Sequence, residues 1–347
     1  MENQQNGHKR RVRYSGTHPK RYQEKYKELQ PEKYPETIEK VIQKGGTPVG
    51  MHISICVKEI LDFIQIQPGQ KGLDATLGYG GHTKEMLKCL QGQGHLYALD
   101  VDPIESVKTK ERLEKAGYGE EILTIRQMNF ADIDQIAREA GPFDFVLADL
   151  GVSSMQIDNP ERGFTYKKEG PLDLRLNPQK GVSAAERLKE VTEEELAGML
   201  WENSDEPYAE EIAATVMEKL RKGEPVETTI QLQKAIEEAL SFLPEREQKE
   251  AVKKSCQRTF QALRIDVNSE FEVLYAFMEK LPAALAPGGR VAILTFHSGE
   301  DRIVKKAFKE LKRAGIYSEI AQDVIRPSAE ECTRNSRARS TKMRWAL

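Results

Sequence analysis

The sequence has 347 residues, of which 31% are charged and 39% hydrophobic, and its formal net charge is −3. No apolar run approaches the roughly 18–20 residues that span a bilayer, and the polar, basic start lacks the hydrophobic core of a signal peptide, so we expect neither a membrane-spanning nor a secreted protein. The four cysteines form no CxxC pair, which argues against a structural zinc site and a disulfide framework. The length predicts two domains, and the scattered cysteines predict a reducing, cytoplasmic compartment.

Positive charge gathers at the two ends of the chain. Residues 1–27 carry eight Lys or Arg against two acids, and the last 46 residues carry twelve against five. Two basic ends on an acidic body favour a polyanionic partner such as a nucleic acid, although a solvated tail explains the same pattern. Residues 1–48 lack a sustained apolar period and are predicted to form a basic, flexible tail.

An amphipathic helix is expected from His52, and strands and helices then alternate. The predicted strands are Lys71–Thr76, Gly94–Asp100, Ile122–Arg126 and Phe143–Asp149, and the helices between them are Lys84–Leu90, Ser106–Lys115 and Ile133–Glu139. This alternation predicts an α/β fold, with a parallel sheet that carries helices on both faces.

The pattern changes after the fourth strand, where helical periodicity dominates. The predicted helices are Glu193–Trp201, Tyr208–Arg221, Thr229–Leu240 and Glu245–Lys254, and the hydroxyls of Thr228 and Thr229 can cap the third of them. A helix over Phe271–Leu285 and a strand over Arg290–Thr295 then resume the alternation. We therefore predict one α/β domain, residues 49–155 and 258–347, that carries a helical insertion at residues 156–257.

A glycine cluster, Gly78–Thr83, follows the first predicted strand and opens a predicted helix. Gly80 and Gly81 leave backbone N–H groups exposed at a helix N-terminus, and we expect a side chain at Gly80 to enter the space of a ligand. The dinucleotide fingerprint matches only in part, because Thr83 stands at its last glycine position, and a P-loop sequence is absent here. A tight turn without a ligand is the alternative.

Three further residues stand where strands are predicted to end. Asp100 lies 20 residues after Gly80, where a carboxylate can accept hydrogen bonds from the ribose of either NAD or S-adenosylmethionine. The ring of Phe130 can pack on an adenine or simply belong to the core. Asp149 ends the fourth strand at the carboxyl edge of the sheet, where ligands sit in open α/β folds, and no Tyr-x-x-x-Lys pattern typical of hydride transfer lies near it.

Six segments of the chain resemble the MraW/RsmH family of small-subunit ribosomal RNA cytosine-N(4)-methyltransferases. They are DATLGYGGHT, DLGVSSMQIDNPERGFTYKKEGPLDLRLNP, GVSAAERL, RTFQALRIDVNSE, LAPGGRVAILTFHSGEDRIVK and NSRARSTKMR. They follow the family's order and extend from about His52 to Arg344, so the resemblance is far more specific than the glycine cluster alone.

The resemblance implies a class I methyltransferase fold, S-adenosylmethionine as the cofactor, and methylation of the exocyclic N(4) amine of a cytosine in ribosomal RNA of the small subunit. It places the cofactor contacts on Gly80, Gly81, His82, Asp100, Phe130, Asp149 and Gln156. It also implies that the helical insertion recognises the substrate. Asp149 is our candidate catalytic residue, as the acceptor that holds the amine, and this chemistry needs no metal.

The chain departs from the family's pattern in segments that can touch the substrate. Gly299 stands where the family usually has Leu, and Lys253–Arg258 and Ser204–Glu206 differ as well. These changes suggest a divergent paralogue and leave the target base open. The same chemistry on another RNA, and a non-catalytic assembly factor that binds the cofactor, are the alternatives.

Several charged residues admit two interpretations. His297 follows the last predicted strand, where it can act near the substrate or, more commonly, serve as a hydrogen-bonded structural histidine. A salt-bridged loop explains one charged group as well as RNA contact does: Arg162, Asp173 and Arg175. A second group can bind phosphates or simply lie on a solvated edge: Arg334, Arg337, Arg339, Lys342 and Arg344.

Overall fold

One six-stranded sheet, in the order β3-β2-β1-β4-β5-β6, organises the computed structural model, which describes residues 54–347. The strands are β1 (Lys71–Asp74), β2 (His95–Asp100), β3 (Leu123–Gln127), β4 (Phe143–Asp149), β5 (Leu285–Thr295) and β6 (Lys342–Ala346). The first five are parallel, which confirms the predicted α/β fold, and β6 runs antiparallel to β5. The basic tail predicted at residues 1–48 lies outside the described residues.

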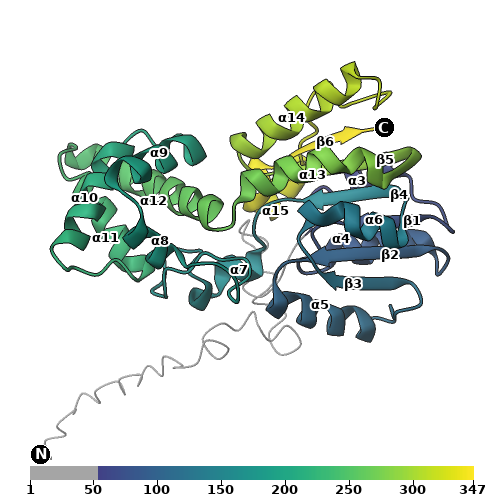
Figure 1. Cartoon of the computed structure of the whole chain (residues 1–347), viewed down its shortest axis with the longest axis horizontal. Coiled ribbons are helices and arrows are strands. Elements are labelled where there is room, and N and C mark those ends of the chain that lie inside the picture. The colour runs from purple at the N-terminus through teal and green to yellow at the C-terminus, as the bar shows by residue number, and fades with distance from the viewer. Residues whose placement is uncertain (1–53) are drawn as a thin grey trace, which may run out of the picture.

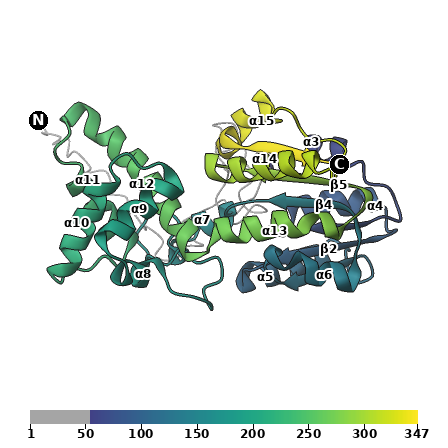
Figure 2. The ribbon, with the colours of Figure 1, turned by 45° about the horizontal axis from the view of Figure 1, so that its top comes forward.

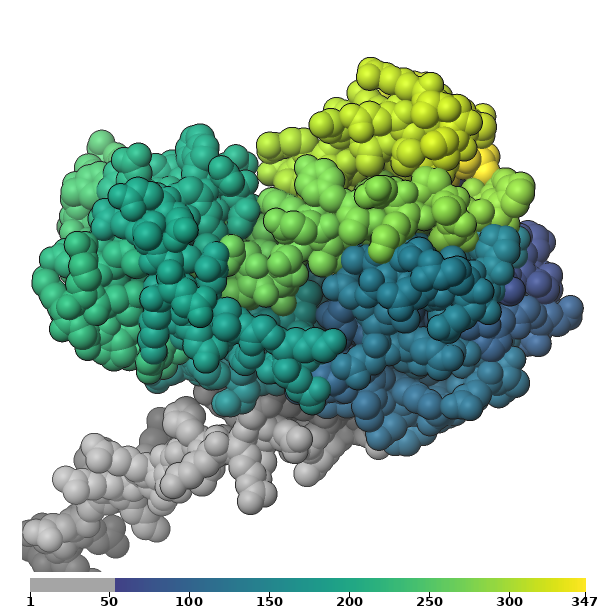
Figure 3. Space-filling view, in the orientation of Figure 1, coloured from purple at the N-terminus to yellow at the C-terminus, as the bar shows by residue number. Residues whose placement is uncertain are grey.

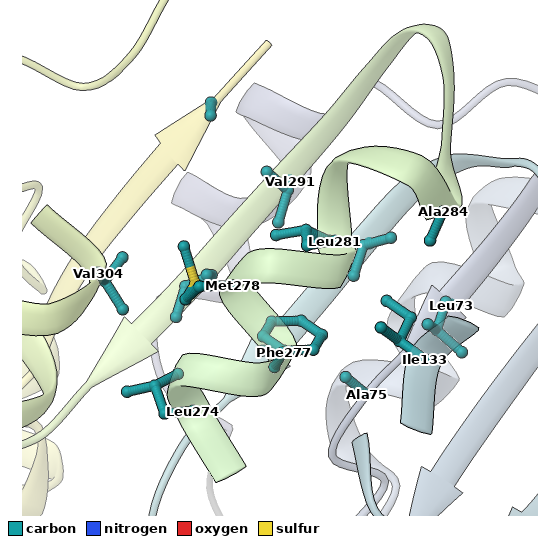
Figure 4. Packing of buried hydrophobic residues seen from close by; sticks show 14 of the residues in the cluster. Leu73, Ala75, Ile133, Leu274, Phe277, Met278, Leu281, Ala284, Val291 and Val304 are labelled. Carbon is teal, nitrogen blue, oxygen red and sulfur yellow. The ribbon is translucent and has the colours of Figure 1, made fainter. Parts of the chain in front are cut away.

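Helices cover both faces of this sheet (Figure 1). One face packs against α6 (Ile133–Ala140), α13 (Glu270–Ala284) and α14 (Ser298–Arg313), with Phe277 among the residues at its centre (Figure 4). The other face packs against α3 (Val57–Ile64), α4 (Gly81–Leu90) and α5 (Pro103–Lys115). Successive residues of β4 serve opposite faces, as a strand buried on both sides requires: Val146 belongs to the first core and Phe145 to the second.

A second group of helices forms a separate hydrophobic cluster beside the sheet (Figure 2). It consists of α8 (Ala184–Glu190), α9 (Glu193–Ser204), α10 (Ala209–Arg221), α11 (Thr229–Ala239) and α12 (Glu245–Val267). The Thr228 hydroxyl accepts a hydrogen bond from the Gln231 N–H at 3.2 Å and caps α11, as predicted.

The end predicted for the helical insertion, residue 257, falls inside α12. This helix is 23 residues long and continues to Val267 because Phe260 and Leu263 keep its apolar side in the helical cluster. The same helix therefore belongs to the helical cluster along its length and ends beside the sheet, where α13 begins.

The strand order reverses direction between β1 and β4, since β2 and β3 continue to one side and β4 and β5 to the other. In open α/β sheets, ligands bind at such a reversal, outside the carboxyl ends of the strands. The short α7 (Ser154–Asp158) and α15 (Ala329–Arg334) also lie near this edge (Figure 1). No helix in residues 54–347 has the length and apolar character that a membrane crossing requires.

Candidate active site

A cavity of about 390 Å³ opens at the carboxyl edge of the sheet, at the reversal between β1 and β4. Its lining includes six of the residues singled out from sequence: Gly81, His82, Asp100, Phe130, Asp149 and Gln156. Gln261 and Arg264 of α12 also line it, so the helical cluster contributes to one wall. In the space-filling view the helical part and the sheet part form two lobes that meet through the green α12–α13 segment (Figure 3).

The glycine turn presents its backbone to this cavity, but Gly80 serves a different purpose from the one predicted. Gly80 has φ +80°, and a Cβ built there would lie 2.7 Å from Thr109 Cγ2 on α5. A side chain at Gly80 would therefore meet α5 and not the ligand space, which corrects the expectation from sequence. Gly81 begins α4 and lines the cavity.

Asp100 ends β2 with both carboxylate oxygens held by backbone groups. Oδ2 accepts from the Gly78 N–H at 2.8 Å, and Oδ1 accepts from the Asp102 N–H at 2.8 Å. Burial nevertheless penalises the charged form and raises the pKa of Asp100 to about 7. Each oxygen retains a second lone pair, so the carboxylate can still accept hydrogen bonds from the two hydroxyls of a ribose.

His82 ties Asp149 to the start of α4. Its Nε2 lies 2.8 Å from the carbonyl oxygen of Ile55, and its Nδ1 lies 3.4 Å from Asp149 Oδ2. Burial alone would lower the pKa of His82, but the hydrogen bond and charge of Asp149 outweigh it and raise this pKa to about 9. The imidazole is therefore a cation at neutral pH, and both ring nitrogens are engaged inside the protein.

Asp149 shows an asymmetry between its two oxygens. Oδ2 faces His82, whereas Oδ1 is buried and has no hydrogen-bond partner among residues 54–347. A buried polar atom without a partner costs about 1–3 kcal/mol. Such an atom at the edge of a cavity is a candidate acceptor for a ligand hydrogen.

Asp102, which sequence reasoning did not select, connects the loop after β4 to β2. It is fully buried, and its Oδ2 accepts from Gln156 Nε2 at 2.8 Å and from Arg162 Nη1 at 2.7 Å. Arg162 is 6% exposed, so the structure makes it a buried ion-pair partner and not an RNA contact. The sequence signal for Asp102 was the Pro that follows it, because Asp before Pro is typical of a helix start.

Phe130 and His297 both line the cavity, after β3 and after β5. The Phe130 ring packs edge-on against Phe277 of the core, 5.1 Å between centroids, and also lines the cavity, so the core interpretation is confirmed and the contact with an adenine stays a prediction. His297 lies just beyond β5, with Nε2 at 3.2 Å from Glu300 Oε1. This contact with Glu300 is the one partner of Nε2 among the described residues, and Nδ1 has none, so the expectation of a structural histidine is met only on the Nε2 side.

Gly299 provides the space for a ring beside His297. A Cβ at this position would lie 2.6 Å from Phe271 Cζ and 3.2 Å from His297 Cε1. The Leu that the family's pattern has here would displace the Phe271 ring from its present position. This departure from the pattern therefore allows the present packing of Phe271 beside His297, which lines the cavity.

The remaining basic residues are mostly paired. Arg175 donates to both oxygens of Asp173 at 2.8 Å, and Arg344 is 5% exposed and pairs with Asp301 at 2.7 Å. Lys342 also pairs with Asp301, and Arg337 pairs with Asp158 where it lines the cavity. Arg334 and Arg339 are exposed, and Arg334 pairs with Glu330.

The family model described as the MraW methylase family matches residues 50–347. The chain belongs to this family. Its fold and the family together make it an S-adenosylmethionine-dependent methyltransferase of class I, as the motifs predicted.

Curated relatives extend the match over the whole chain. "Ribosomal RNA small subunit methyltransferase H 1" of Lachnoclostridium phytofermentans is 72% identical, covering 100% of this chain and 94% of its own length. "Ribosomal RNA small subunit methyltransferase H 2" of Alkaliphilus metalliredigens is 65% identical, covering 100% and 99%. "Ribosomal RNA small subunit methyltransferase H" of Pseudoalteromonas atlantica is 36% identical, covering 85% of this chain and 97% of its own length.

Proposed function

We propose that this protein transfers a methyl group from S-adenosylmethionine to the exocyclic N(4) amine of a cytosine in small-subunit ribosomal RNA. The observation that carries the proposal is the arrangement of Asp100 and Asp149 on the two sides of one cavity in a member of the MraW methylase family. The relatives' names, which specify small-subunit ribosomal RNA, support the choice of substrate.

The β1–β3 side of the cavity fits the cofactor. S-adenosylmethionine supplies a methyl group activated by a sulfonium. The backbone at Gly81 lies at the N-terminus of a 10-residue helix, where N–H groups are free to donate. Asp100 offers a carboxylate for ribose hydroxyls, and Phe130 offers a ring for the adenine. His82 and Gln156 act in part by holding Asp149 and Asp102.

Asp149 is the group we assign to the substrate amine. The lone pair of a cytosine amine is delocalised into the ring, so the amine is a weak nucleophile that gains from precise orientation. Oδ1 of Asp149 is a buried acceptor without a partner among the described residues. A hydrogen bond from the amine to this oxygen would orient the nitrogen and increase its electron density as the new bond forms.

The helical cluster is our candidate for recognising the RNA. Its long helix α12 presents Lys253 and Lys254 to solvent, carries the half-buried Arg258 beside Glu206, and reaches the cavity with Gln261. Phosphate contacts from such side chains position a nucleic acid without reading its sequence. We place the reaction in the cytoplasm, on ribosomal RNA within the small ribosomal subunit.

Mass-spectrometric mapping of N(4)-methylcytidine tests the function directly. Small-subunit RNA from cells that lack the gene should lose this modification at one position, and the purified protein with S-adenosylmethionine should restore it. Loss from transfer RNA alone would favour the same chemistry on another RNA. Unchanged modification together with tight cofactor binding would favour the non-catalytic assembly factor.

A further inference from the structure

His297 and Glu300 form a pair whose geometry is unlike that of the ion pairs on the surface. Glu300 is 3% exposed, and its Oε2 accepts from the Phe296 N–H at 2.8 Å, which fixes the carboxylate. Its Oε1 lies 3.2 Å from His297 Nε2. The fixed carboxylate thus lies on the Nε2 side of the imidazole. On its other side, the ring nitrogen Nδ1 has no partner among the described residues.

The charges around this pair are already compensated. Glu270, at the start of α13, has an oxygen within 4.8 Å of the polar atoms of His297 and Glu300. Both of its oxygens, however, accept from Arg264, at 2.8 and 2.9 Å. Because a guanidinium engages the Glu270 carboxylate, the three residues form an ion-paired group and not a set of open ligands for a cation.

Burial raises the pKa of Glu300, but His297 and Arg264 outweigh it, so the pKa of this carboxyl is lowered and Glu300 is an anion. A buried carboxylate next to an imidazole favours the tautomer with its proton on the shared nitrogen, here Nε2. This leaves Nδ1 as an acceptor. Phe271 packs beside the ring, 5.9 Å between centroids, and limits how it can turn.

The pair lies next to Asp149 across the sheet. Asp149 at the end of β4 is in register with Leu294 of the neighbouring β5, and His297 follows three residues later. Asp149 and His297 both line the cavity. Two unpartnered acceptors, Asp149 Oδ1 and His297 Nδ1, thus lie on the substrate side of one cavity, and an amine has two hydrogens to offer.

We propose that His297, positioned by Glu300, is a second catalytic residue that accepts the proton lost by the substrate amine. This role rests on the proposed function. When the N–C bond to the methyl group forms and the S–C bond breaks, the nitrogen carries one hydrogen too many for the neutral product. His297 Nδ1 takes that proton, Asp149 holds the hydrogen that remains, and the proton leaves to solvent after product release.

The pH dependence of single-turnover methylation, at saturating cofactor and RNA, tests this role. For the wild-type protein the rate should rise about tenfold per pH unit at acid pH and then level off, because the base must be neutral. H297N has a similar shape but cannot take up a proton, so it should be roughly 100- to 1,000-fold slower and lack this acid limb. H95N, at the amino edge of the sheet, is the matched control and should resemble the wild-type protein.

E300Q tests the positioning role with a measurement that does not need turnover. Removing the carboxylate should weaken the preference for a proton on Nε2, so the 15N NMR shifts of the His297 ring in the cofactor-free protein should report a changed mixture of tautomers. Melting temperatures and RNA affinities of all variants provide the check on folding and binding.

An H297N protein with the wild-type rate and acid limb would overturn the proposal, as would an E300Q protein whose His297 ring shows the wild-type 15N shifts. A wild-type protein that methylates no cytosine would instead overturn the proposed function, and this role with it.

Discussion

The two halves of the cavity differ in how their polar groups are satisfied. On the β1–β2 side, Asp100 and the adjacent Asp102 each have hydrogen-bond donors to both carboxylate oxygens. On the β4–β5 side, Asp149 Oδ1 and His297 Nδ1 have no hydrogen-bond partner within residues 54–347, and His297 Nε2 has only its 3.2 Å contact with Glu300.

This difference separates two tasks. Groups that are already hydrogen-bonded are held rigidly, so the β1–β2 half can bind a cofactor with little rearrangement. Unsatisfied buried atoms are costly in the free protein, and they persist where a bound molecule supplies the missing partner. This difference supports our proposal that the β4–β5 half receives the reacting group.

The largest expected effect is on the β4–β5 half, with D149N. His82 donates to one side of residue 149, so the Asn oxygen should face His82 and its NH2 group should replace Oδ1 toward the amine. A donor would then face a donor, and we expect single-turnover methylation to fall roughly 100- to 1,000-fold. D144N, at the other end of β4, is the matched control. A D149N protein as active as D144N would remove Asp149 from the reaction.

The same variant should change how stability depends on pH. The pKa of His82 is raised from 6.5 to about 9 in the folded protein, so its stabilising effect is fully present below pH 6.5 and is lost as the pH rises through about 9. Between pH 6 and 10 the melting temperature of the wild-type protein should fall. The melting temperature of D149N should be lower than that of the wild-type protein at pH 6 and should fall less over this range. Parallel curves for the two proteins would contradict the His82–Asp149 coupling.

An intermediate effect is expected on the β1–β2 half, with D100N. The pKa of Asp100 is about 7 without ligand, and ribose hydroxyls favour the ionised form, so cofactor binding should release a proton below pH 7. Calorimetric titration with S-adenosylhomocysteine should show affinity that increases up to about pH 7 and then levels off. D100N should bind about 10- to 100-fold more weakly at pH 8, with little pH dependence.

D62N, on the exposed side of α3, is the control for this experiment and should reproduce the wild-type curve. Wild-type affinity that does not vary between pH 5.5 and 8 would contradict the assignment of Asp100 to the ribose.

The difference between the two halves also explains what could be predicted from the sequence. The parallel strands and the glycine turn follow from local patterns, so β1–β5 and the residues at their carboxyl ends were predicted. Strand β6 was not, because the short KMRWA segment owes its place to pairing with β5, about 50 residues earlier in the chain. Arg344 was accordingly considered for RNA contact, whereas its burial against Asp301 depends on that pairing.

Hydrogen bonds and ion pairs between residues far apart in the chain could not be predicted from the sequence either. Gln156 and Arg162 converge on Asp102 from 54 and 60 residues away, and no local pattern encodes such a convergence. Buried atoms that lack a hydrogen-bond partner are even harder to predict from sequence, since the lack of a partner for His297 Nδ1 depends on every element around it. The direction of a glycine's missing side chain is also set by tertiary packing, as Gly80 shows.

The smallest expected effect comes from G80A, compared with G92A. Both glycines have positive φ, +80° and +73°, so each alanine should cost about 1 kcal/mol of backbone strain. Only Gly80 has a neighbour in the way: Thr109 Cγ2 is 2.7 Å from the new Cβ, and the Thr109 hydroxyl is held by the Gly78 carbonyl at 2.6 Å. Overpacking adds about 1 kcal/mol or more in such a case.

G80A should therefore lower the free energy of unfolding about twice as much as G92A in denaturant titrations. Because the new methyl group faces α5, the affinity of folded G80A for S-adenosylhomocysteine should change by less than about threefold, or about 0.7 kcal/mol. If G80A is stable but binds the cofactor much more weakly, a side chain at position 80 points into the ligand space after all. It would also mean that the cofactor half of the cavity is less rigid than its hydrogen bonds indicate.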